Sequence, residues 1–135
     1  MSKHCTPLER AVMEKMLQGD DPTLHSLRSQ FQHSTVRSRE FTGVGFFTHF
    51  EVMDGVNRLA RKSMTFGDVL AQLPGLEHGA GFVVFVKDGG LDLLEAYTFD
   101  EPWPDRIEPF TLSYDSGTER DWSKLKRALV GAQEQ

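Results

Sequence analysis

The strongest constraint on the fold is the segment AGFVVFVKD at residues 80–88, which is apolar at nearly every position. A strand that is apolar at both odd and even positions is typical of the centre of a sheet covered on both faces. The turn Asp88-Gly89-Gly90 follows, and the segment LDLLEAYTF then predicts the second strand of a hairpin. We therefore expect a sheet with residues 80–99 at its centre.

Two amphipathic helices are predicted before the sheet. The sequence TPLE at residues 6–9 predicts a helix start, because threonine caps a helix, proline suits its first turn and glutamate completes a capping box. Apolar residues then recur at helical spacing until Gly19 ends the helix. A second helix is predicted from Asp21-Pro22, with an apolar face made of Leu24, Leu27 and Phe31.

The pattern changes to alternation after residue 33, which predicts a strand over TVRSREF, a turn at Gly43 and a strand over VGFFTHFEV. A three-residue turn would place Arg37 and Arg39 opposite His49 and Phe47 on the outer face of the sheet. The inner face of the second strand is then predicted to consist of Val44, Phe46, Phe50 and Val52.

The remaining segments complete an α+β fold. We expect a weaker strand within 54–64, one helical turn within 65–75, where Thr65 and Asp68 resemble a cap, a loop at 100–106 and a strand over 107–114. A helix is expected from Asp121, with Leu125, Leu129 and also Trp122 as candidate docking residues. The prediction is an N-terminal helical hairpin packed on a mostly antiparallel sheet of five or six strands, with a short C-terminal helix. Residues 1–135 are expected to form one domain with frayed ends at about 1–5 and 131–135.

The charge of the chain is unevenly distributed. The net charge of the chain is −5. The range from Asp88 to Glu108 holds seven acids and one base, which gives this range a net charge of −6 and the rest of the chain a net charge of +1. Nucleic-acid binding requires a basic surface, so we expect no nucleic-acid partner. An acidic segment favours a protein partner with a basic surface.

Other patterns argue against several classes of function and location. The longest apolar runs fall short of the roughly 20 residues that span a bilayer, and the N-terminus lacks the apolar core of a signal peptide. The single cysteine, Cys5, suits a reducing compartment, so we predict a cytoplasmic protein. The five histidines lack metal-binding spacing and the glycines form no phosphate loop, so we expect no metal and no cofactor.

The loop DEPWPDR supplies the first candidate binding residues. Trp103 lies between two prolines, which stiffen the loop and reduce the entropy lost when a partner binds. A rigid aromatic residue among carboxylates resembles an interaction hot spot. Alternatively, Trp103 folds back against the core and the acids are merely solvated. The carboxylates around it are Asp100, Glu101 and Asp105.

A second group of candidates lies on the predicted strands. Glu95 interrupts an apolar row that includes Tyr97, and a buried carboxylate there would be a site candidate because desolvation raises its pKa. Alternatively, Glu95 marks a bulge or pairs with an arginine for structural reasons. In a third alternative, the inward-facing row of the strand switches to Leu94 and Ala96, so that Glu95 points outward. A further polar patch, either an anion site, a catalytic group or a solvated surface, would consist of His49, Glu51, Arg37 and Arg39.

Residues 27–52 and 75–104 together resemble a family of small, mostly uncharacterised bacterial α+β proteins. The glycine hairpin followed by Leu-Glu-x-Tyr is also similar to immunity proteins of bacterial toxin systems. The resemblance implies a compact cytoplasmic α+β domain, and it brings no catalytic residues.

These observations rank three hypotheses. The first is a non-catalytic protein-binding module, with immunity-like neutralisation of a basic toxin as one version, that binds through the acidic segment around Trp103. The alternative is a small-molecule binder or enzyme with a polar site around Glu95, Tyr97 and His49. The third is a homo-oligomer that forms through a strand at residues 35–41.

Overall fold

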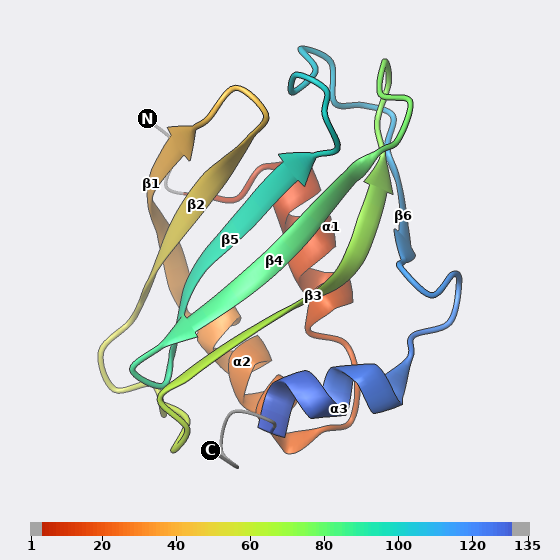
Figure 1. The fold of residues 1–135 in the computed structure, drawn as a ribbon. Helices are drawn as coiled ribbons and strands as arrows, with labels where there is room; N and C mark the ends of the chain where they lie inside the picture. Colours follow the sequence, from red (N-terminus) through yellow and green to blue (C-terminus); the bar gives the residue numbers. More distant parts are fainter. Residues whose placement is uncertain (1–3, 131–135) are drawn as a thin grey trace.

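The computed structural model describes residues 4–130, so most of the predicted frayed ends lie outside the described residues. It confirms the predicted α+β fold, with one antiparallel sheet in the order β1-β2-β5-β4-β3-β6 and an N-terminal pair of helices on one side of it (Figure 1). The elements are α1 (Pro7–Met16), α2 (Pro22–Gln32), β1 (Ser34–Phe41), β2 (Gly45–Val52), β3 (Ser63–Gln72), β4 (Ala80–Lys87), β5 (Gly90–Thr98), β6 (Thr111–Tyr114) and α3 (Trp122–Val130).

The helix starts form as local chemistry predicts. Thr6 Oγ1 accepts a hydrogen bond from the Glu9 amide at 3.1 Å, and Glu9 Oε1 accepts one from the Thr6 amide at 2.8 Å, which confirms the capping box. At the second helix, Asp21 accepts a hydrogen bond from the Thr23 amide. The apolar faces of both helices pack on the sheet and bury Leu8, Val12, Met13, Met16, Leu17, Leu24 and Leu27.

Residues 80–87 form the central strand β4, but the described helices cover it on one face only, so the expectation that this strand is covered on both faces is wrong. Phe82 and Val84 are buried toward the helices, whereas Val83 and Phe85 on the other face of β4 are half-buried. In the described part of the chain, all three helices lie behind the sheet or at its lower end, and the front face carries none (Figure 1). We call this uncovered side the open face.

The helical turn predicted within residues 65–75 is wrong, because this segment forms most of β3. It pairs with β4 on one side and with β6 on the other, and these long-range contacts outweigh the local resemblance to a helix cap. A register shift between Phe66 and Val69 turns Asp68 inward, where Arg120 donates to it at 2.7 and 2.9 Å. The strand predicted within 54–64 is also displaced, since β3 starts only at Ser63.

The hairpin of β1 and β2 contains a bulge that the sequence did not reveal. Val36 pairs with Phe50 and Ser38 pairs with His49, so Arg37 is an extra residue in β1. Beyond the bulge the side chains change faces, because successive residues of a strand point to opposite sides.

As a result, Arg39 lies opposite Thr48 on the inner face, and its predicted place on the outer face is wrong. Phe41 follows it onto the inner side, opposite Phe46. Val44, which we expected on the inner face, lies before β2 and remains 48% exposed.

Candidate functional site

The acidic segment is divided between two ends of the molecule. Asp88 lies in the turn that precedes β5, and Asp100 follows the other end of the same strand. A strand of nine residues spans roughly 30 Å, so the seven acids form no single surface. The carboxylates near Trp103 belong to the loop at 99–110, and Glu77 joins them from the loop at 73–79.

Trp103 is held against the sheet and leaves part of its surface accessible. Its amide donates to the carbonyl of Gly43 at 2.9 Å, which ties the loop to the turn between β1 and β2. Its indole meets the ring of Phe46 edge to face, with centroids 5.2 Å apart and an angle of 87°. Trp103 is half-buried. It is therefore neither fully exposed, as the hot-spot hypothesis expected, nor fully folded back into the core, as the alternative expected.

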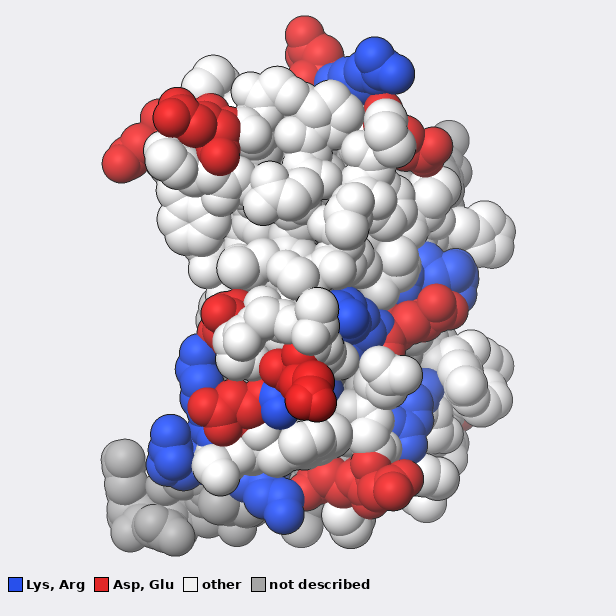
Figure 2. All heavy atoms as spheres, turned by 90° about the vertical axis from the view of Figure 1, so that its right-hand side faces the viewer, with Lys and Arg blue, Asp and Glu red and all other residues white. Residues whose placement is uncertain are grey.

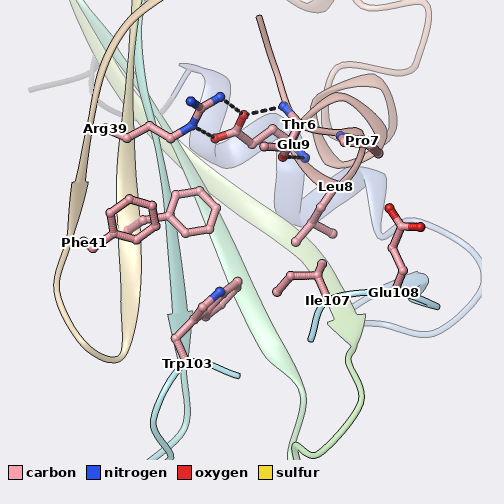
Figure 3. Close-up of a pocket in the computed structure, with 10 residues that line it drawn as sticks. Thr6, Pro7, Leu8, Glu9, Arg39, Phe41, Trp103, Ile107 and Glu108 are labelled. Carbon is pink, nitrogen blue, oxygen red and sulfur yellow. Dashed lines mark hydrogen bonds and ion pairs between the residues drawn. The ribbon is translucent and has the colours of Figure 1, made fainter. Parts of the chain in front are cut away.

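One face of Trp103 lines a pocket of about 280 Å³ at this end of the molecule (Figure 3). The pocket lies between the β1–β2 hairpin, the first turn of α1 and the loop at 99–110. Phe41 stands at its edge with 74% of its surface exposed. The lining residues, which are mostly apolar, are Thr6, Pro7, Leu8, Glu9, Arg39, Phe41, Phe46, Trp103, Ile107 and Glu108.

The polar side of the pocket is a neutralised ion pair. The Glu9 side chain is 1% exposed and accepts hydrogen bonds from Arg39 Nε at 2.8 Å and Arg39 Nη2 at 2.7 Å. The hydroxyl of Thr48 also donates to it. Burial by itself raises the pKa of Glu9, but the hydrogen bonds from Arg39, Thr48 and Thr6 outweigh burial and lower this pKa. Glu9 is therefore a carboxylate whose charge Arg39 balances.

Glu101 anchors the loop that carries Trp103. Its carboxylate accepts hydrogen bonds from the amides of Glu77 at 3.0 Å and His78 at 3.1 Å, and these bonds lower its pKa. Its carbonyl accepts a hydrogen bond from the hydroxyl of Thr98. Of the predicted contact acids, Glu101 thus joins two loops, while Asp100 and Asp105 are exposed.

The other predicted candidates on β5 lie on the open face, away from the pocket. Glu95 is opposite Phe47 on β2 and Val83 on β4. Leu94 and Ala96 are buried on the inner face, which confirms the alternative in which these two residues, and not Glu95, form the inner row of the strand. Burial and the charge of Glu95 both raise the pKa of Tyr97.

The predicted polar patch is not assembled as one unit. His49 Nε2 lies 2.6 Å from Glu40 Oε1 on the open face. Glu51 is exposed near the far end of β2, and Arg37 is exposed at the bulge. Only Arg39 of this patch reaches the pocket.

Of the residues that line the pocket, only Trp103 and Arg39 were predicted as site residues, and the most consequential ones missed are Glu9 and Phe41. Glu9 was interpreted only as a helix-capping residue, and Phe41 only as a strand residue. The bulge at Arg37 determines that Arg39 and Phe41 meet Glu9 and Trp103 in one place, and no local pattern marks it.

Three further observations bear on other classes of function. Within residues 4–130, no group of three or more His, Cys, Asp or Glu side chains is placed to hold a metal ion. In the same range, no helix is both long enough and apolar enough to cross a membrane. Comparison with known proteins gave no match to a family model, a curated protein or a solved structure.

Proposed function

We propose that this chain is a non-catalytic protein-binding module. Its contact surface would be the pocket described above together with the loop at 99–110 that carries Trp103. Immunity-like neutralisation of a basic toxin remains one concrete version of this proposal. In that version the carboxylates would speed the encounter and the aromatic residues would anchor the complex.

The observation that carries the proposal is the exposed aromatic edge of an apolar pocket. Phe41 is 74% exposed beside a half-buried Trp103, and aromatic residues at partly open pockets are typical anchors of protein interfaces. The pocket volume of about 280 Å³ lies at the lower limit of the roughly 300–1,000 Å³ typical of small-molecule sites. It therefore suits one large side chain of a partner better than a whole drug-sized ligand.

The fixed geometry of the loop also supports binding. The loop is tied to Gly43 through the Trp103 amide and to residues 77 and 78 through Glu101. A preorganised surface loses little entropy when it binds, so more of the contact energy appears as affinity.

A pull-down with chemical crosslinking from extracts of the native host tests the proposal. Phe41→Ser removes an exposed ring with little effect on folding, and we expect it to lose the partner that the wild type retains. Met53→Ser is the matched control, because Met53 is 58% exposed just beyond β2, at the opposite end of that strand from the Phe46 side of the pocket. The proposal fails if Phe41→Ser and Trp103→Ala, both shown to be folded by circular dichroism, retain the same partners as wild type.

A further inference from the structure

We infer that the pocket receives one uncharged apolar side chain from a partner segment whose flanking residues are lysine or arginine. This inference rests on the proposed function and specifies the chemistry of the partner. Two independent observations carry it: the neutralised charges inside the pocket and the acidic loops at the pocket end of the sheet.

The interior of the pocket favours an uncharged occupant. Its walls include Leu8, Phe46, Trp103 and Ile107, and its buried carboxylate, Glu9, is already paired with Arg39. A cation that entered the pocket would lose its hydration and would find the Glu9 carboxylate already paired. An anion would likewise lose its hydration and would find Arg39 already bonded to Glu9. An aliphatic or aromatic side chain incurs no such cost and buries apolar surface.

The loops at the pocket end of the sheet, of which the one at 99–110 lines the pocket, favour a basic partner. Three loops lie at this end of the sheet, at residues 42–44, 73–79 and 99–110 (Figure 1). Together they contain five acids and one base, a net charge of −4. The acids are Glu77, Asp100, Glu101, Asp105 and Glu108.

The rest of the chain is nearly neutral, since outside these three loops it has 14 lysines and arginines and 15 acids, a net charge of −1. The loop at 53–62 contains one acid and three bases and α3 adds Lys124, Lys126 and Arg127, but Asp88, Asp92 and Asp121 lie in or beside the turn before β5 and the start of α3. Figure 2 shows mainly acidic side chains around the upper loops, whereas basic and acidic side chains are intermixed in the lower half. The concentration of negative charge at the pocket end steers an approaching basic segment toward it, because opposite charges attract.

A partner of another sequence fits this end better than a symmetric second copy does. A two-fold contact through the pocket would bring two acidic rims together, and like charges oppose such a contact. Association of the pocket with a different surface of another copy would instead produce an open chain of molecules. The concentration dependence of the sedimentation coefficient distinguishes these cases from binding of a separate partner.

Labelled nine-residue peptides test the inference by fluorescence anisotropy. Each peptide has a central leucine, phenylalanine or serine between two pairs of lysines or two pairs of glutamates. We expect lysine-flanked peptides with a central leucine or phenylalanine to bind about tenfold or more tightly than the lysine-flanked serine peptide, because one apolar side chain is buried. We expect the glutamate-flanked versions to bind at least about tenfold more weakly, since several exposed ion pairs become repulsions.

Variants and salt locate the binding. Phe41→Ser should weaken binding of the lysine-flanked leucine peptide about tenfold, whereas Met53→Ser should leave it unchanged. Raising the salt concentration from 50 to 500 mM should reduce the advantage of lysine over glutamate flanks.

Several results would overturn the inference. Equal binding of leucine and serine peptides would show that no side chain is anchored, and equal binding of lysine and glutamate peptides would show that the rim does not select charge. An unchanged affinity in Phe41→Ser would place the contact elsewhere. Absence of binding by every peptide at 1 mM, or self-association that Phe41→Ser abolishes, would also reject it. These failures leave the proposed function standing if the pull-down partner is lost in Phe41→Ser.

Discussion

Replacing Arg39 by alanine leaves the Glu9 carboxylate buried without a cation beside it. The Glu9 side chain is 1% exposed and that of Arg39 is 18% exposed, and the substitution removes hydrogen bonds of 2.7 and 2.8 Å. Breaking a buried ion pair costs about 3–5 kcal/mol, and water has partial access to Arg39, so we expect a loss of about 3 kcal/mol at pH 7. A domain of this size would then melt roughly 10 °C lower.

Urea unfolding followed by far-ultraviolet circular dichroism measures this loss. Arg37→Ala is the matched control, because Arg37 is an exposed arginine in the same strand and should change the free energy of unfolding by no more than about 0.5 kcal/mol. Adding Glu9→Gln to Arg39→Ala should restore part of the stability, since a neutral amide is less costly to bury than an unpaired carboxylate.

The pH dependence gives an independent check with a defined sign. The pKa of Glu9 is lowered in the folded wild type, so the unfolded chain binds more protons and Glu9 stabilises the fold above its ordinary pKa of 4.5. This contribution is lost as the pH falls through the folded pKa. In Arg39→Ala, burial should raise the pKa of Glu9, so that the carboxyl is protonated in mild acid.

The difference in stability between wild type and Arg39→Ala should therefore be largest near pH 7 and should shrink as the pH falls from 6 toward 3. Equal destabilisation by Arg39→Ala and Arg37→Ala would refute this account of the pocket. A difference that grows as the pH falls would refute it as well.

Two further predictions concern how the helices dock. A Cβ added at Gly19, where φ is +137°, would lie 2.1 Å from the Trp122 ring, so Gly19→Ala should cost about 1–3 kcal/mol and alter tryptophan fluorescence. Gln30 is fully buried, donates to the Gly89 carbonyl at 3.1 Å and accepts from the Leu91 amide at 2.7 Å. Gln30→Ala should cost about 2–4 kcal/mol and accelerate hydrogen exchange at Leu91, and unchanged exchange there would contradict the assigned bond.

The elements that the sequence predicted well are those that neighbouring residues determine. The capping box at residues 6–9 and the helical spacing of apolar residues identified α1, α2 and α3, because caps and helix faces depend on residues within one or two turns. The glycine turn at 88–90 likewise identified the β4–β5 hairpin.

The segment at 65–75 shows where such local reasoning fails. Gly67 packs so closely on β4 that an added Cβ would lie 2.2 Å from the Phe82 carbonyl oxygen, and Asp68 is satisfied by Arg120, 52 residues later. Both contacts depend on residues distant in the sequence, so the spacing of Thr65 and Asp68 misleadingly resembled a helix cap. Partners at such distances cannot be identified from the segment itself.

The candidate site was predicted in part for the same reason. Trp103 and Arg39 were both identified as site candidates, but in two separate groups, and the pocket brings them together. The open-face candidates Glu95, Tyr97 and His49 share a face of the sheet and do not line this pocket. Residue type alone thus indicated candidates, while strand register determined which of them meet.

The single extra residue at Arg37 links the fold to the proposed function. Without it, strict alternation from Val36 would direct Ser38 and Glu40 inward and leave Arg39 and Phe41 on the open face. Glu9 would then be buried without its cation, and the pocket would lack its exposed aromatic edge. The bulge that brings Arg39 to the buried Glu9 carboxylate also places Phe41 at the edge of the apolar pocket, so stability and the proposed binding depend on the same backbone irregularity.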